Sequence, residues 1–304
     1  GPEIVTSSDL EEQFSGTLAR LNLRPGILES MSGIQERRFW PLGTKPSTIG
    51  TAAAQRPLAA AKVKPDEIGC LVSTSVMRDY IEPSTASLIH GNLKLPAGCM
   101  NYDLGNACLG FVSGMVNIAL MIETGAIRRG LVVAGEAGRE LIESMLDTLR
   151  QPATSRQQLM ENIATLTLGE GAVSLSATEH NRLCVASATH MTTYPARLMH
   201  AGLGLMEKTW QLAKDTLVGI SDDRIKMYVP HQVSSHNTRV YVDGLNLTAA
   251  KVKLTFPWLG NTGPVGLPTA LGMTGESNEI KSGDPVCLMG IGSGLNSTIM
   301  SVSW

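Results

Sequence analysis

The chain has 304 residues, of which 43% are hydrophobic and 17% charged, and its formal net charge is −2. This composition predicts a globular protein with a sizeable core, and the small net charge argues against nucleic acid as the main partner. No run of about 18 apolar residues predicts a membrane span, and the start shows no signal-peptide pattern. Five scattered cysteines without C-x-x-C spacing suggest neither a disulfide framework nor a metal site. We therefore expect a cytoplasmic protein.

Two places in the sequence look incomplete. The chain opens at Gly1-Pro2 without an initiator methionine, and residues 178–205 pass through mixed signals in a short space. We hypothesise that an N-terminal strand and one or more loops near 180–200 are missing from this sequence. An intact mass that matches these 304 residues alone would contradict the hypothesis.

Short apolar runs alternate with helical periodicities along the chain, and each pattern predicts one element. In chain order we expect a strand over 68–76, a helix over 83–93, a strand over 100–105, a helix over 111–123, a strand over 130–135, a helix over 137–149, a strand over 172–177, a helix over 205–218, a strand over 226–231, a helix over 267–273, and strands over 284–290 and 298–304. This alternation predicts an α/β fold with layered, largely buried sheets.

The two halves of the chain carry a weak internal echo. The segments around Ile68 and Ile225 share an aspartate two residues before the isoleucine and a valine four residues after it. The offset is 225 − 68 = 157 residues, about half the chain, as expected for a duplicated α/β unit. We therefore predict two similar halves, residues 1–177 and residues 178–304.

The most distinctive stretch is Asn106-Ala-Cys108-Leu-Gly110, which lies between a predicted strand and a predicted apolar helix. A thiol at a helix N-terminus meets free N–H groups and the positive end of the helix dipole, and both favour the thiolate. Cys108 is therefore a candidate nucleophile. Without partners, a buried structural role is the better interpretation of a single cysteine.

Two loops of the second half offer partners for Cys108. His231 stands in a Pro-His-Gln segment that ends a buried strand, and strand ends in α/β sheets are where ligand chemistry collects. Asn261 stands in a Gly-Asn-Thr-Gly loop, whose composition alone fits an ordinary turn before a helix. A cysteine, a histidine and an asparagine on separate loops are the ingredients of an acyl-transfer or condensing site.

A further loop, Gly290-Ile-Gly292-Ser293-Gly294, has three glycines in five residues, which allow a close approach of its backbone to a ligand. It could form an oxyanion hole or hold a phosphate, although it lacks the lysine and the helix of a P-loop. The first interpretation requires the N–H groups of Ser293 and Cys108 to converge on a thioester oxygen.

These four motifs stand in the same order as those of the condensing enzymes of the thiolase superfamily, which the sequence resembles over nearly its whole length. Ser32-Gly-Ile-Gln-Glu-Arg-Arg38 also resembles the opening signature of ketoacyl synthase III. The resemblance implies a five-layer αβαβα thiolase fold built from two similar halves, a dimer, and a Cys–His–Asn site. Arg37 and Arg38 are candidates for contacts with the CoA phosphates, with a surface ion pair as an equal alternative.

Glu82 is the residue that distinguishes branches of this superfamily. The segment from Arg78 to Ser87 resembles the OleA family, the acyl-CoA condensing enzymes of long-chain olefin biosynthesis. In that family the base is a glutamate that reaches the site from the other subunit, and the resemblance assigns this role to Glu82. From the residues alone, Glu82 is better explained as a solvated carboxylate near a helix N-terminus.

The resemblance implies an acyltransferase that condenses two long-chain fatty acyl-CoAs, without decarboxylation, to a 2-alkyl-3-ketoacyl-CoA in the first step of olefin biosynthesis. Cys108 would carry the first acyl group, His231 and Asn261 would face the second thioester, and Glu82 of a homodimer partner would remove its α-proton. No cofactor is expected besides the coenzyme A thioester substrates. Downstream pathway enzymes are further candidate partners.

Two alternatives stay open at this stage. One is a decarboxylative ketoacyl synthase III that uses malonyl-carrier protein, and the other is a subunit of a heterodimeric condensing enzyme for β-lactone lipids. Degradative thiolases carry a second cysteine in the C-terminal glycine loop, where this chain has Ser293. Hydroxymethylglutaryl-CoA synthase resembles the chain less in the context of Glu82 and in length.

Overall fold

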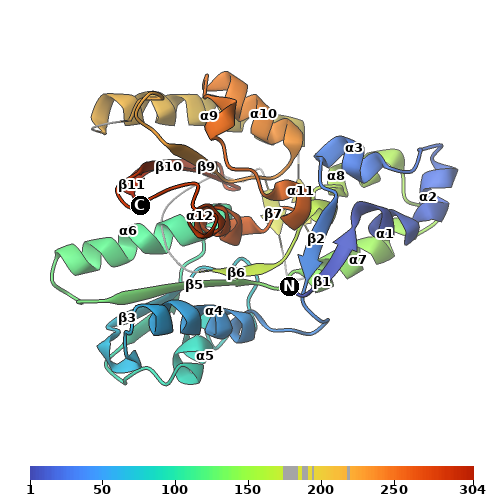
Figure 1. The fold of residues 1–304 in the computed structure, drawn as a ribbon. Helices are drawn as coiled ribbons and strands as arrows, with labels where there is room; N and C mark the ends of the chain where they lie inside the picture. Colours follow the sequence, from blue (N-terminus) through green and yellow to red (C-terminus); the bar gives the residue numbers. More distant parts are fainter. Residues whose placement is uncertain (174–183, 187–190, 194, 218–219) are drawn as a thin grey trace.

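Two β-sheets alternate with layers of helices (Figure 1). This computed structural model describes residues 1–173, 184–186, 191–193, 195–217 and 220–304. The first sheet consists, in spatial order, of β4 (Met100–Asp103), β3 (Cys70–Ser73), β5 (Gly130–Glu136) and β6 (Gly171–Val173). The second sheet consists, in spatial order, of β11 (Asn296–Ser303), β10 (Pro285–Gly292) and β9 (Met227–Pro230).

Helices form the other three layers (Figure 1). The outer face of the first sheet is covered by α4 (Pro46–Ala60) and α5 (Thr85–Asn92). Between the sheets lie α6 (Gly110–Glu123) and α12 (Gly266–Glu276). The outer face of the second sheet is covered by α9 (Pro195–Thr216) and α10 (Ser235–Gly244). The prediction of an α/β fold with five αβαβα layers is confirmed.

The central helical layer packs against both sheets because α6 presents apolar side chains on two sides, and α12 adds to the side that faces the second sheet. Phe111 and Ile118 of α6 belong to one core cluster with Val72 and Val132 of the first sheet. The second sheet forms a separate cluster with the central helices, which contains Val112, Leu267, Ala270, Val229 and Leu288. The central helical layer is therefore held in place by the burial of apolar side chains against both sheets.

The two sheets are connected in the same way, in agreement with the similarity between the segments around Ile68 and Ile225. In the first half β3 is parallel to β5, and in the second half β9 is parallel to β10. The offset between β3 and β9 is 227 − 70 = 157 residues, and that between α6 and α12 is 266 − 110 = 156 residues. The predicted boundary between the halves, at 177 and 178, lies outside the described residues and stays a prediction.

The predicted elements are found, with several changes at their ends. The strand predicted over 68–76 stops at Ser73, because the next residues bond to side chains as well as to backbone. The helix predicted over 205–218 begins ten residues earlier, at Pro195. Of the strand predicted over 172–177, residues 174–177 lie outside the described part of the chain, as does much of the segment near 180–200.

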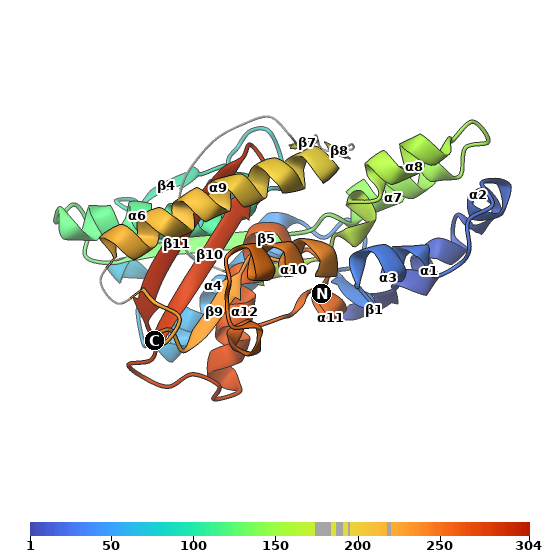
Figure 2. The same ribbon diagram turned by 90° about the horizontal axis from the view of Figure 1, so that it is seen from above.

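An arm of short helices projects from one side of the layered body, as Figures 1 and 2 show. It contains α1 (Ser7–Glu12), α2 (Ser15–Arg20), α3 (Ile27–Ser32), α7 (Arg139–Leu149) and α8 (Arg156–Asn162). Its own core includes Leu10, Phe14, Leu28, Ile142 and Leu149. Most of these helices were not predicted, since six or seven residues are too few for a clear helical periodicity.

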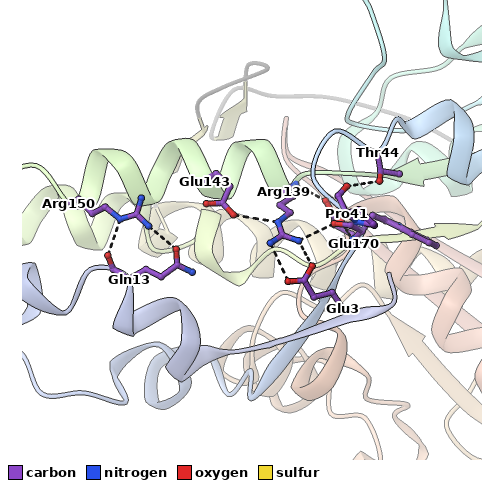
Figure 3. A network of polar contacts seen from close by, with 9 residues as sticks. Glu3, Gln13, Pro41, Thr44, Arg139, Glu143, Arg150 and Glu170 are labelled. Carbon is purple, nitrogen blue, oxygen red and sulfur yellow. Dashed lines mark hydrogen bonds and ion pairs between the residues drawn. The ribbon is translucent and has the colours of Figure 1, made fainter.

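The arm is joined to the start of the chain by arginines at the two ends of α7, Arg139 at its first residue and Arg150 just after its last (Figure 3). Arg139 forms ion pairs with Glu3 and with Glu143, and Arg150 donates to the carbonyl and the side chain of Gln13 at 3.0 and 2.8 Å. Glu3 belongs to β1 (Glu3–Thr6), which pairs with β2 (Glu36–Phe39) in a small antiparallel sheet. Residues far apart in the sequence thus fix the base of the arm.

The remaining short elements connect these layers. They are β7 (Cys184–Ala186), β8 (Met191–Thr193), α11 (Phe256–Leu259) and the 3₁₀ turns Pro65–Glu67, Ala107–Leu109, Thr165–Thr167, Ala249–Lys251 and Gly263–Val265. Within the described ranges, no helix is both long enough and apolar enough to cross a membrane.

Candidate active site

A cavity of about 590 Å³ opens where the arm meets the layered body. The body contributes the four residues predicted from the loop motifs, Cys108, His231, Asn261 and Ser293. The arm and its connections contribute mainly apolar side chains, which include Met31, Leu141, Ile163 and Leu168. The structure therefore brings the polar groups of four separate loops to one partly apolar cavity, as a site for a thioester with an acyl chain requires.

Cys108 lies in the 3₁₀ turn that leads directly into α6. The preceding Ala107 has a φ of +43°, which is uncommon for a residue with a Cβ and marks a tight bend before the cysteine. Gly110 follows because a Cβ there would meet the carbonyl oxygen of Thr74 at 2.6 Å. This bend places the half-buried Cys108 at the N-terminal end of an apolar helix, as predicted.

The other described cysteines have a different environment. Burial raises the pKa of Cys99 to about 11 and that of Cys287 to about 12, and Cys70 is also buried. Each belongs to an apolar core cluster. Of the four cysteines whose side chains are described, Cys108 alone lines the cavity.

The cysteine turn is fixed to the glycine-rich loop. Leu109 of the cysteine turn packs against Gly290. A Cβ at position 290 would come within 2.0 Å of the Leu109 Cδ2 atom, so only glycine leaves room for the turn. The amides of Asn106 and Asn296 bond to each other reciprocally at 3.2 Å, and Asn106 also donates to the Ser113 hydroxyl at 2.7 Å. Cys108 and Ser293 are thereby held in a fixed relation.

The glycine-rich loop is the end of β10 followed by a short hairpin turn. Gly292 still pairs with Asn296 of β11, so the turn itself consists of Ser293, Gly294 and Leu295. Gly294 has a φ of +83°, which a residue with a Cβ rarely adopts. Ser293 lies half-buried at the cavity wall.

His231 follows the last residue of β9, and its N–H donates to the carbonyl of Met289 on β10 at 2.8 Å. The ring is 4% exposed, and neither ring nitrogen has a hydrogen-bond partner within the described part of the chain. Burial lowers the pKa of His231 to about 4. The imidazole is thus neutral at pH 7 and can accept a proton or donate a hydrogen bond.

The depressed pKa of His231 predicts a pH-dependent contribution to stability. The unfolded chain binds a proton at His231 below its usual pKa of 6.5, whereas the folded chain does so only near 4. The stabilisation is therefore complete above pH 6.5 and is lost as the pH falls towards 4. From about pH 7.5 to about pH 5, we expect the wild type to lose about 2 kcal/mol of unfolding free energy relative to His231→Asn.

Urea denaturation of both proteins at one fixed protein concentration measures this difference. Comparison with the variant removes the contributions of all other titrating groups. A stability difference that stays constant over the pH range would contradict the predicted protonation state of His231.

Backbone hydrogen bonds to the segment that contains Thr167 and Gly169 fix the position of Asn261. Its N–H donates to Thr167 at 2.8 Å, and its carbonyl accepts from Gly169 at 3.0 Å. A Cβ on Gly169 would come within 1.9 Å of the Leu259 carbonyl oxygen, so only glycine fits there. The Asn261 side-chain oxygen accepts from the N–H of Gly263 at 3.1 Å, which leaves its amide NH₂ as the group able to donate to a ligand.

Glu82 is placed differently from the other predicted site residues. It does not line the cavity of its own chain, and it lies exposed beside Ile81, which is fully exposed. The N-terminus of α5 is capped instead by Ser84 and by Asp103, whose carboxylate accepts from the first N–H groups of the helix at 3.0 and 2.8 Å. Glu82 thus lies exposed just before α5, as expected for a solvated carboxylate near a helix N-terminus, and its role as a base stays a prediction.

The structure does not bring Arg37 or Arg38 to the cavity. Arg37 is 1% exposed and donates to the Ser7 hydroxyl and to the Leu166 carbonyl, both at 3.1 Å. Its burial contradicts the expectation of a contact with CoA phosphates. Arg38 is half-buried and pairs with Glu36 at 3.3 Å, which agrees with the alternative of an ion pair.

Sequence analysis missed Glu136, which is one of two charged residues in the cavity lining, the other being Arg78. Glu136 is the last residue of β5, it is 6% exposed, and it lines the cavity together with Cys108. Burial raises the pKa of Glu136 to about 8, although the N–H groups of Val76 and Met77 oppose this shift. The available signal was a carboxylate directly after an apolar run, at the end of a parallel strand.

The described residues contain no group of three or more histidine, cysteine or acidic side chains that could hold a metal ion.

Comparisons with known proteins agree with this geometry. Residues 102–151 match the family described as 3-oxoacyl-[acyl-carrier-protein (ACP)] synthase III, and residues 217–304 match its C-terminal family. The chain is 36% identical to an acyl-CoA:acyl-CoA alkyltransferase of Xanthomonas campestris, covering 100% of this chain and 95% of the relative. It is 32% identical to an enzyme of the same name from Shewanella oneidensis, with the same two coverages.

Solved structures give the same result. A cysteine-to-serine variant of Xanthomonas campestris OleA, solved with bound lauric acid and lauroyl-CoA, superposes with a TM-score of 0.95 at 36% identity. The match covers 100% of this chain and 96% of that one.

Proposed function

The chain belongs to the family of acyl-CoA:acyl-CoA alkyltransferases of the thiolase superfamily, and on this basis we propose that it condenses two long-chain fatty acyl-CoAs. The product is a 2-alkyl-3-ketoacyl-CoA, formed without decarboxylation. The observation that carries the proposal is the convergence of Cys108, His231, Asn261 and Ser293 on one partly apolar cavity.

In the first half-reaction Cys108 takes an acyl group from the first acyl-CoA. The neutral imidazole of His231 accepts the thiol proton, and the thiolate attacks the thioester carbonyl. The N–H groups of Cys108 and Ser293 hold the oxyanion that forms. When the carbonyl re-forms, the C–S bond to CoA breaks, and the CoA thiolate takes the proton back from His231.

In the second half-reaction another acyl-CoA binds with its thioester oxygen facing His231 and Asn261. Donation from both groups stabilises the enolate that forms when a base removes the α-proton. We assign this base to Glu82 of the partner subunit. The α-carbon then attacks the acyl-cysteine carbonyl, and the released thiolate of Cys108 recovers the proton from Glu82.

A homodimer is part of the proposal because Glu82 cannot serve as a base in the cavity of its own chain without leaving its exposed position. Neighbouring apolar side chains support a partner at this surface, since Tyr80 is 54% and Ile81 100% exposed. A second copy that covers these side chains would bury apolar area and insert Glu82. A cytoplasmic location and a first step in olefin biosynthesis belong to the same proposal.

Incubation with myristoyl-CoA alone, followed by mass spectrometry of protein and products, tests this function. We expect an acyl adduct on the protein and a branched β-keto thioester, because the second acyl-CoA supplies the carbon nucleophile. A product that forms only with a malonyl thioester and releases CO₂ would instead assign ketoacyl synthase III activity. Absence of any acyl adduct would favour a subunit that acts only in a heterodimer.

A further inference from the structure

Glu136 is a buried carboxylate in the cavity wall for which the proposed condensation has no role. Its Oε1 atom accepts from the N–H of Val76 at 2.6 Å, and its Oε2 atom accepts from the N–H of Met77 at 3.3 Å. Val76 and Met77 lie three and four residues after the end of β3 at Ser73 and line the same cavity. The side chain of Glu136 therefore takes the place of a strand partner for this part of the backbone.

The segment that begins at Val76 and Met77 leads to Glu82. It is fixed a second time at Asp79, whose carboxylate accepts from the N–H and the hydroxyl of Ser47 at 2.8 and 2.6 Å. After Asp79 the chain reaches the exposed residues around Ile81 and Glu82. The segment that carries Glu82 is thus anchored by Glu136 and Asp79 before it and by Asp103 after it, and of these three carboxylates only Glu136 lines the cavity.

We propose that Glu136 is a positioning residue for Glu82, which it acts on through the backbone of Val76 and Met77. By accepting both N–H groups, Glu136 fixes the point at which residues 74–82 leave the sheet. Glu82 is then held at the distance that lets it enter the partner subunit's cavity. The inference rests on the proposed function, in which Glu82 is the base of the second half-reaction.

The Glu136→Gln variant separates this positioning role from general packing. Glutamine has nearly the same shape, but only its oxygen can accept, and its NH₂ group would face a second N–H donor. One of the two bonds is therefore lost and replaced by a repulsive contact. The ionised form of Glu136 accepts with both oxygens and predominates above its pKa of about 8, so the two proteins are compared at about pH 9. Glu136→Asp keeps both acceptors on a shorter side chain and is expected to restore part of the activity.

The test measures the two half-reactions separately in the purified full-length protein, with myristoyl-CoA as the probe. For Glu136→Gln we expect acylation of Cys108 close to the wild-type rate and condensation lowered by about 10- to 100-fold, because a misplaced base slows only the second step. In the double variant Glu82→Ala/Glu136→Gln, we expect condensation no slower than in Glu82→Ala, since both changes act on one step.

Amide hydrogen exchange tests, independently of activity, whether the hydrogen bonds of Glu136 to Val76 and Met77 hold this segment in place. We call these two hydrogen bonds the tether. Peptides that cover residues 74–82 should exchange faster in Glu136→Gln than in the wild type, whereas peptides from β10 should not change. Glu170→Gln is the matched control. Glu170 is also buried and accepts two backbone N–H groups, from Trp40 at 2.5 Å and Arg139 at 2.6 Å, but it lies at the base of the arm (Figure 3). It should change neither the exchange of 74–82 nor the ratio of the two half-reactions.

Several results would overturn the inference. Unchanged exchange over 74–82 in Glu136→Gln would show that no tether exists, and unchanged condensation would show that the tether does not position the base. Slower acylation in Glu136→Gln would show that Glu136 has a role apart from Glu82. So would condensation in the double variant that is slower than in Glu82→Ala alone. Full condensation by Glu82→Ala alone would refute the base assigned in the proposed function, whatever the exchange data show.

Discussion

Replacement of Cys108 by alanine is expected to abolish the acyl-enzyme and with it the condensation. Without the thiolate, the site loses its proposed nucleophile, and both half-reactions lose their covalent intermediate. We expect condensation to fall on the order of 10⁴-fold or more, which is typical for loss of a nucleophile. Mass spectrometry of the intact variant after incubation with myristoyl-CoA should show no added acyl mass.

Cys99→Ala provides the matched control for this variant. Cys99 is 4% exposed in a core cluster beneath the first sheet, and burial raises its pKa to about 11, so its thiolate is scarcely populated at neutral pH. The control should acquire the acyl mass as the wild type does. An acyl adduct on Cys108→Ala would mean that another residue carries the acyl group.

The motif residues of the cavity could be predicted because each belongs to a local pattern at the end of a strand or the start of a helix. The bend before Cys108 and the end of β9 at His231 depend on residues close in the sequence. The layered α/β architecture follows from the alternation of apolar runs in the same way. Local patterns thus identified four of the groups that meet at the cavity.

Arg37 shows where local reasoning failed. In β2 the side chains alternate, so Arg37 shares the buried face with Phe39, whereas Glu36 and Arg38 share the other face. The strand had not been predicted, and two adjacent arginines therefore looked equally exposed. A period-2 interpretation of Glu-Arg-Arg-Phe would have separated them.

Glu136 and Glu82 could not be interpreted from nearby residues, because their partners are distant or in another chain. The carboxylate of Glu136 bonds to backbone 59 and 60 residues earlier in the sequence. Neither spacing nor composition encodes such a contact between β5 and the segment after β3. For Glu82 the structure of one chain shows only exposure, and its proposed function requires a second copy.

Replacement of Glu82 by alanine should separate the two half-reactions. Acylation of Cys108 requires no carboxylate base, so myristoyl-CoA should still add an acyl group to the variant. Condensation should fall by about 10²- to 10⁴-fold, because removal of the α-proton loses its general base. Quantification of the acyl adduct and of the β-keto product in one reaction measures both effects. A Glu82→Ala protein that condenses normally would remove this base from the mechanism.

Mixing two inactive variants determines which subunit supplies the base. In a hybrid dimer of Cys108→Ala and Glu82→Ala, one site combines an intact Cys108 with an intact Glu82 from the other chain, and the second site has neither. If the base acts across the interface, random exchange of equal amounts should restore condensation at about a quarter of the sites. If Glu82 served the cavity of its own chain, no site of the hybrid would contain both groups. Mixing would then restore nothing, whereas co-purification of the untagged variant with an affinity-tagged partner variant would verify that subunits exchange.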